Sequence, residues 1–162
     1  MPKQFRVGAF DRFNNAVMWF LLRVGVRFGT FAIMTVRGRK SGRPIETPLV
    51  VFEKDENRYL VAPYGVVNWV RNVRAAAGEI TLTRGRHTEE VTAVELSPAE
   101  AAPVFRHTLQ TGPPRIPRLM FKAYRRFQVL PYLDVDMTSS LGEFERAAQT
   151  HPIFAVLPKR SN

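Results

Sequence analysis

The sequence predicts an α+β domain whose sheet is a small barrel of about six short, mostly antiparallel strands. Short runs rich in β-branched and aromatic residues recur along the chain, and turn residues separate them. Few helices intervene between these runs, so a doubly wound sheet with long crossover helices is disfavoured. The length of 162 residues and the hydrophobic fraction of 45% suit one domain with a substantial core. The predicted strands lie at residues 31–36, 47–52, 59–62, 79–83, 88–96 and 153–157.

Before the first strand, residues 1–28 are expected to form an N-terminal amphipathic helix, with its regular part at 10–28. At 3.6 residues per turn, Arg12, Arg23 and Arg27 fall within about 60° of one another, beside a broad apolar face. Such a helix can lie on an anionic membrane surface or cover one end of the core, and the sequence leaves both interpretations open.

Three further helices are expected between and after the strands. Residues 68–77 have helical periodicity and stop near Gly78. Ser97 at the N-cap, followed by proline and then a glutamate at the third position, starts a helix that runs to about residue 110. Residues 117–127 are basic and aromatic and are also expected to be helical.

We expect the whole chain, residues 1–162, to be one domain. Its parts are the N-terminal helix, a barrel core at 30–112, a basic-aromatic segment at 113–136 and a closing strand at 150–158.

Composition excludes several kinds of chemistry and favours anionic partners. The chain has no cysteine, so disulfides and thiolate catalysis are excluded, and its 3 histidines are too scattered to suggest a metal centre. The net charge of +10 suits a polyanionic small molecule, an anionic membrane or nucleic acid. We see no secretory signal and no apolar run near the ~20 residues that span a bilayer, so a cytoplasmic location is expected, with contact at the inner membrane face as an option.

A basic loop, defined here as residues 37–43, separates the first two predicted strands. Arginine and lysine donate charge-assisted hydrogen bonds to phosphate or carboxylate oxygens. Its glycines allow a tight turn that brings backbone N–H groups near an anion. The spacing is not that of a Walker A loop, so nucleoside triphosphate chemistry is not expected. The loop therefore predicts an anion site, with a solvated surface loop as the alternative. Its cationic and hydroxyl residues are Arg37, Arg39, Lys40, Ser41 and Arg43.

A second motif follows the strand that ends at Ala62. A glycine turn leads into a helix that opens near residue 68, and helix N-termini favour anions. Trp69 and Asn72 are three residues apart and share a helix face, where they can supply a flat apolar wall and a directional amide. The alternative places Trp69 in the core and makes Asn72 a local cap.

In this order, the basic loop, Thr47-Pro48-Leu49 and Trp69-x-x-Asn72-x-x-Ala75 resemble the deazaflavin (coenzyme F-420)-dependent nitroreductase and quinone reductase family. The resemblance spans roughly residues 30–110 and implies a split β-barrel of the flavin-reductase type that binds coenzyme F-420. It implies that the basic loop meets the phosphate and oligoglutamate tail of that cofactor. It also implies a ring site with Pro48 and Leu49 on one side and Ala62, Trp69 and Asn72 on the other and under the cofactor's side chain.

The chain departs from the family pattern at three places. Pro63-Tyr64 stands where small or hydroxyl residues are usual, Arg71 stands where a histidine is frequent, and Ala76-Ala77 replaces a common Asn-Pro. These departures concern the ring geometry and the electron acceptor more than the tail site.

The implied reaction is transfer of a hydride from the reduced deazaflavin to a quinone, a nitro-aromatic or an activated alkene. A proton must accompany the hydride, and Tyr64, Tyr124 and Tyr132 are candidate donors or polar anchors, with simple packing as the alternative for each. The 113–136 segment is expected to form the substrate-side wall and, with the N-terminal helix, to touch an anionic membrane where quinones reside.

Alternative functions stay open at this stage. An FMN or FAD oxidoreductase would also need a phosphate site and a flat apolar wall. A barrel that carries the cofactor without turnover is a second alternative. A nucleic-acid-binding module would use the same basic and aromatic residues, although we do not expect nucleic acid as a partner. The sequence fits both a monomer and a homodimer.

Overall fold

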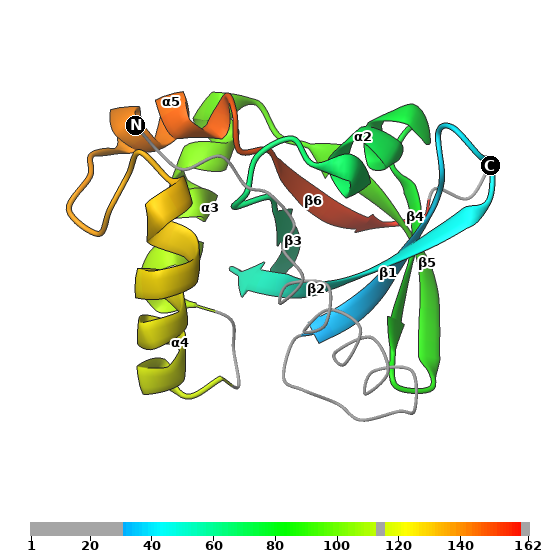
Figure 1. Cartoon of the computed structure of the whole chain (residues 1–162), viewed down its shortest axis with the longest axis horizontal. Helices are drawn as coiled ribbons and strands as arrows, with labels where there is room; N and C mark the ends of the chain where they lie inside the picture. Colours follow the sequence, from blue (N-terminus) through cyan, green and yellow to red (C-terminus); the bar gives the residue numbers. More distant parts are fainter. Residues whose placement is uncertain (1–30, 113–115, 160–162) are drawn as a thin grey trace.

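The computed structural model of the protein describes residues 31–112 and 116–159. The predicted N-terminal helix at 1–28 lies outside the described residues. The described part consists of a closed six-stranded β-barrel with helices gathered mainly on one side of it (Figure 1).

All the strand pairs of the barrel are antiparallel, in the order β1-β2-β3-β6-β5-β4, and pairing of β4 with β1 closes it. The predicted sheet type and the predicted number of strands are confirmed. The strands are β1 (Phe31–Arg37), β2 (Pro44–Lys54), β3 (Asn57–Val61), β4 (Glu79–Arg84), β5 (His87–Glu95) and β6 (Ile153–Pro158).

Alternation along the strands fills the barrel interior. On β1, Met34 and Val36 are buried, and their partners on β4, Leu82 and Ile80, are buried too. Because side chains alternate between the two faces of a strand, these paired positions point to the same side of the sheet. The inward-facing residues of the strands form one continuous apolar cluster, which also includes Phe154 of β6.

Helices α3 and α5 form a second core beside the barrel. Phe105 of α3 and Phe144 of α5 are fully buried and meet edge to face, with 5.6 Å between their ring centroids. Ile153 at the start of β6 joins this cluster and links it to the sheet. The helical elements are α2 (Asn68–Ala75), α3 (Pro98–Thr111), α4 (Arg118–Tyr124), a π-helix (Arg125–Val129), a 3₁₀ turn (Leu130–Tyr132) and α5 (Leu141–Ala148).

Helix α2 sits apart from the other helices, over the barrel and beside the turn that joins β1 to β2 (Figure 1). That turn is the basic loop, so the fold places the two sequence motifs next to each other. Among residues 31–112 and 116–159, no helix combines the length and the apolar character that crossing a membrane requires.

Candidate functional site

The basic loop has its own internal hydrogen bonds. The Gly38 N–H donates to the Arg43 carbonyl at 2.8 Å, and the Gly42 N–H donates to the Gly38 carbonyl at 2.8 Å. Gly38 is buried, and a Cβ there would lie 2.7 Å from Ile45 Cδ1 and 2.9 Å from Ser41 Oγ. Gly42 has φ of +69°, a conformation that favours glycine. The loop is therefore a preformed turn whose shape requires both glycines.

The charges of this loop are not neutralised by neighbouring carboxylates. Within the described residues, none of the cations Arg37, Arg39, Lys40 and Arg43 forms an ion pair, although other cations of the protein do. The ion pairs found elsewhere are Lys54–Asp55, Arg58–Glu89, Arg74–Glu95 and Lys159–Glu90. Four uncompensated cations on one short turn create a strong local positive potential that attracts anions.

The first turn of α2 adds backbone donors beside this loop. Its N-cap residue, Val67, makes no side-chain cap, and no acidic residue lies in the first turn. By contrast, α3 and α5 both begin with a serine–glutamate capping box that uses their free N–H groups. Arg39 Nη2 donates to Asn68 Oδ1 at 3.3 Å, so the uncapped end of α2 lies against the basic loop. An uncapped helix start beside unpaired cations suits a phosphate or carboxylate group.

The predicted ring-lining residues lie in or against the barrel core. Ala62 is buried, and its N–H donates to the Pro152 carbonyl at 3.0 Å. Leu49 and Trp69 are partly buried against the same apolar cluster, and the Trp69 ring lies 5.8 Å from that of Phe154. Pro48, one residue before Leu49 on β2, pairs with Ile33 of β1. Leu49 and its β1 partner Ala32 face the barrel core, whereas Pro48, the neighbouring strand position, faces the other side of the sheet. Trp69 lies on α2, the helix that contacts the basic loop through Asn68.

Asn72 is a buried amide that joins α2 to the basic loop, and the alternative that made it a local cap of α2 is wrong. It is 2% exposed, and its Oδ1 accepts hydrogen bonds from the Arg39 backbone N–H at 3.3 Å and from Arg39 Nη1 at 2.8 Å. Its side chain makes no cap on α2, whose N-cap residue is Val67. The contact of Asn72 and Asn68 with Arg39 was not predicted, because no local pattern links positions so far apart.

The three predicted tyrosines come together in space. The hydroxyls of Tyr64 and Tyr124 are 3.3 Å apart, and either can be the donor. The rings of Tyr64 and Tyr132 meet edge to face, with 5.2 Å between centroids. Tyr64 follows β3, whereas the other two come from α4 and the 3₁₀ turn, so the cluster joins the barrel to the helical side.

Arg125 and its neighbours hold this helical side in place. Arg125 Nη1 donates to the Leu109 carbonyl at 2.7 Å, near the C-terminal end of α3, and its guanidinium lies 5.6 Å from the centre of the Phe121 ring. This arginine of the basic-aromatic segment therefore supports packing and is not part of a charged surface.

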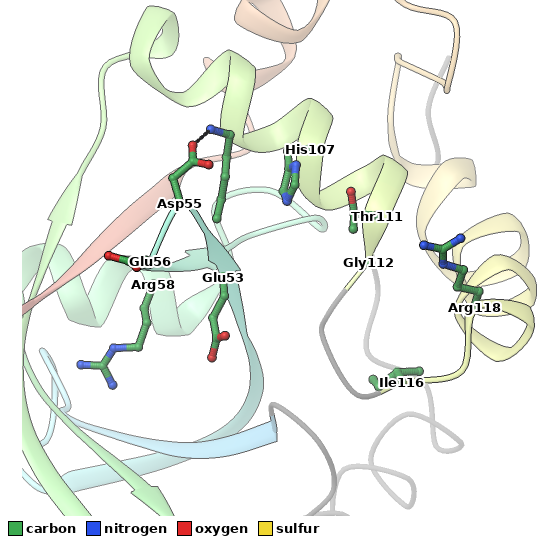
Figure 2. Close-up of a pocket in the computed structure, with 10 residues that line it drawn as sticks. Glu53, Asp55, Glu56, Arg58, His107, Thr111, Gly112, Ile116 and Arg118 are labelled. Carbon is green, nitrogen blue, oxygen red and sulfur yellow. Dashed lines mark hydrogen bonds and ion pairs between the residues drawn. The ribbon is translucent and has the colours of Figure 1, made fainter.

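Two hollows of the described part of the protein are large enough to hold a small molecule. One, of about 760 Å³, lies between the β2–β3 turn and the end of α3; Figure 2 shows His107 and Thr111 of α3 and Arg118 of α4 around it, opposite Asp55. The other, of about 800 Å³, lies against β1, β4, β5 and the end of β6 and includes Arg37 and Gly42 of the basic loop. This hollow borders the basic loop, but no predicted site residue other than Arg37 is among the described lining residues of either hollow. The described residues also contain no group of three or more His, Asp or Glu that could hold a metal ion.

Comparison with solved structures finds several that are similar to this chain. One, described as a domain-swapped dimer, has the same fold, with 18% identity, a TM-score of 0.51 and coverage of 92% of this chain and 99% of that one. An F420-H2 dependent reductase, FDR-A, has 20% identity, a TM-score of 0.47 and coverage of 78% and 93%. An FAD-binding protein from Mesorhizobium loti has 14% identity, a TM-score of 0.41 and coverage of 82% and 83%.

A comparison with curated proteins gives no match. Residues 13–121 match the family described as F420H(2)-dependent quinone reductase, which is more than half of the chain. The chain therefore belongs to the F420H2-dependent quinone reductase family, and it is an oxidoreductase with coenzyme F-420 as its cofactor.

Proposed function

We propose that the protein reduces a quinone with coenzyme F-420, whose phosphate and tail are held by the basic loop and the first turn of α2. The observation that carries this proposal is the absence, within the described residues, of a carboxylate partner for the four loop cations, which lie beside an uncapped helix start. Phosphate and carboxylate groups supply the negative charge and the acceptor oxygens that such a surface needs. The described residues therefore fit the anionic part of the cofactor.

The ring of the cofactor belongs, in this proposal, on an apolar surface between the barrel and α2. Leu49 and Trp69 supply that surface, and both pack against the apolar cluster that contains the buried Ala62. When bound, the reduced deazaflavin supplies a hydride. The apolar side chains orient the ring and exclude water from it, which favours transfer to the acceptor over loss to solvent.

The acceptor also needs a proton, because a quinone becomes a hydroquinone by gaining one hydride and one proton. We assign this step to the hydroxyl pair of Tyr64 and Tyr124, which are 3.3 Å apart. A hydroxyl can donate to the acceptor oxygen while it accepts from its neighbour, so the pair can pass a proton inward from solvent. Tyr124 is 48% exposed, which gives the pair a route to water. Tyr132 packs against Tyr64 and orients it.

The surface of α4 and the π-helix that follows it supports a second proposal, contact with an anionic membrane. Leu119, Met120 and Phe127 are 79%, 65% and 69% exposed, and the cations Arg118 and Lys122 are exposed beside them. Exposed apolar side chains flanked by cations are typical of helices that lie at a lipid surface. We name this set the α4 surface. Co-sedimentation with anionic liposomes at low salt tests the proposal, and no binding there would refute it.

A titration of the purified protein with coenzyme F-420 and with FMN, followed by fluorescence, tests the cofactor site. Oxidation of the reduced deazaflavin by menadione, followed at its visible absorbance, tests the reaction, and a nitro-aromatic and an activated alkene serve as rival acceptors. We expect saturable deazaflavin binding and menadione-dependent oxidation. Tight FMN binding without deazaflavin binding would favour the flavin alternative, whereas salt-dependent oligonucleotide binding unaffected by deazaflavin would favour nucleic acid.

A further inference from the structure

Arg39 is held by two side-chain amides of α2. Asn72 Oδ1 accepts from the Arg39 backbone N–H at 3.3 Å and from Nη1 at 2.8 Å, and Asn68 Oδ1 accepts from Nη2 at 3.3 Å. The two asparagines are four residues apart, so they share one face of the helix. The guanidinium has only donors, so each asparagine must turn its oxygen toward it. This arrangement ties the basic loop to α2 at a single arginine.

The chemistry of these acceptors matters because amide oxygens are neutral. Arg58 and Arg74 are held by the carboxylates of Glu89 and Glu95, which cancel their charge. Arg39 is also held by two hydrogen bonds from its guanidinium, but the amide acceptors leave its positive charge in place. Three of the five N–H donors of the guanidinium are left for another partner. Asn72 is the central member of this arrangement, since it is buried and contacts both the backbone and the side chain of Arg39.

We propose that Asn72 is a positioning residue of the anion site, whose buried amide oxygen fixes Arg39 against α2 without neutralising it. The identity of the anion rests on the proposed function, in which it is the phosphate and tail of the deazaflavin. Asn72 then contributes to affinity through Arg39, in place of the direct contact under the cofactor's side chain that the family resemblance implies.

Hydrogen exchange of the ligand-free protein tests the positioning itself. In Asn72→Ala the amides of residues 38–43 exchange at least about tenfold faster, because a hydrogen bond to a charged group is lost. Asn72→Asp keeps the acceptor oxygen and leaves this exchange near that of the wild type. Thr108→Ala is the matched control: Thr108 is a buried polar residue of α3 that bonds to the Phe105 carbonyl, far from the loop in sequence and packing. It leaves exchange at 38–43 unchanged.

Affinity measurements then separate positioning from direct contact. We expect coenzyme F-420 to bind about tenfold more weakly to Asn72→Ala. Asn72→Asp also binds more weakly although its loop is held, because its carboxylate neutralises Arg39. In a double-mutant cycle, Asn72→Ala causes no further loss in the Arg39→Ala background. Additive losses would overturn the proposal, since they would mean that Asn72 contacts the ligand directly.

The outcomes for the loop and for the cofactor are independent. Arg39→Ala, at an exposed site, is measured beside Asn72→Ala. If the amide exchange rates of residues 38–43 are unchanged in both variants, Asn72 does not position the loop, whatever the protein binds. Faster exchange in both variants, together with no deazaflavin binding by the wild type, would support the positioning role and overturn the proposed function alone.

Discussion

A cation attracts a ligand most strongly where nothing else neutralises it. Among the described residues, the cations that pair with carboxylates lie on strands, on α2 or directly after β6. The four cations of the basic loop form no such pair within the described residues. Net charge alone therefore does not identify the site. The distribution of carboxylates around each cation does so, and this follows from the fold.

The first prediction concerns Lys40 and Arg43. Replacing either with alanine should weaken coenzyme F-420 binding by about tenfold, because each removes a charge-assisted contact to an anion. Arg146→Ala is the control, since Arg146 is an exposed arginine in the last turn of α5 and changes the net charge by the same amount. Fluorescence titration at fixed ionic strength measures the difference. Equal effects of all three variants would show that only a diffuse positive field acts.

The second prediction separates the chemistry from binding at Tyr124. Tyr124→Phe removes the hydroxyl that lies 3.3 Å from Tyr64 but keeps the ring. We expect kcat for menadione reduction to fall by at least about tenfold while the Kd for deazaflavin stays unchanged. Tyr59→Phe, on β3, is the matched control. A fall in kcat that is equal in both variants would remove the tyrosine pair from the mechanism.

At the scale of elements, an ion pair ties two strands that are not neighbours. Arg58 of β3 donates to both carboxylate oxygens of Glu89 of β5, and β6 lies between these strands in the sheet order. Both side chains are about two-thirds or more buried. The hydrogen bond from Arg58 is the main reason that the pKa of Glu89 is lowered from its ordinary value of 4.5, and partial burial opposes it.

The third prediction is the pH dependence of this pair. Because the pKa of Glu89 is lower in the folded state, its contribution to stability is present above pH 4.5 and is lost as the pH falls through the lowered pKa. Glu89→Gln should therefore lower the free energy of unfolding at pH 7 by about 1 kcal/mol and reduce the acid dependence below pH 4.5. Urea unfolding at several pH values measures both. Glu90→Gln, at the exposed pair with Lys159, should leave the acid profile unchanged.

Elements that follow a local rule were predictable from the sequence. The first strand, predicted at 31–36, is observed at Phe31–Arg37, because a short apolar run rich in β-branched residues ends at a glycine-containing turn. The capping box at Ser97 likewise predicted the start of α3. Helix α5 was missed although Ser140 and Glu143 form the same kind of capping box, so the signal was present in the sequence and was not used.

Contacts between distant positions were not predictable from local patterns. The helix expected at 117–127 is observed as α4 followed by a π-helix from Arg125, a change that packing and not propensity decides. Tyr64 and Tyr124 are 60 positions apart, and Arg39 and Asn72 are 33 apart. Only the folded barrel determines which of these residues meet.

At the scale of the whole molecule, the proposed site extends from the basic loop across the barrel to the helical side (Figure 1). The barrel supplies the basic loop, the apolar surface and Tyr64, whereas α4 and the 3₁₀ turn supply Tyr124 and Tyr132. The α4 surface that we propose to touch lipid is therefore on the same helix as a tyrosine that we propose to serve the acceptor. In these two proposals, the shared helix would give a lipophilic quinone a short path from the membrane to the site.

The last prediction tests this continuity with two exposed residues that belong to neither the cofactor site nor the tyrosine cluster. Leu119→Ser combined with Met120→Ser removes apolar area from residues that are 79% and 65% exposed, so the fold should tolerate the change. Reduction of water-soluble menadione should stay at the wild-type rate. Binding to anionic vesicles should fall at least about tenfold, because insertion of these two side chains into the interface is lost. Reduction of a long-chain quinone embedded in those vesicles should slow in parallel.

Leu157→Ser is the matched control, because Leu157 is 41% exposed on β6, and it should match the wild type in every assay. If the double variant reduces the embedded quinone as fast as the control does, the α4 surface has no part in reaching the acceptor.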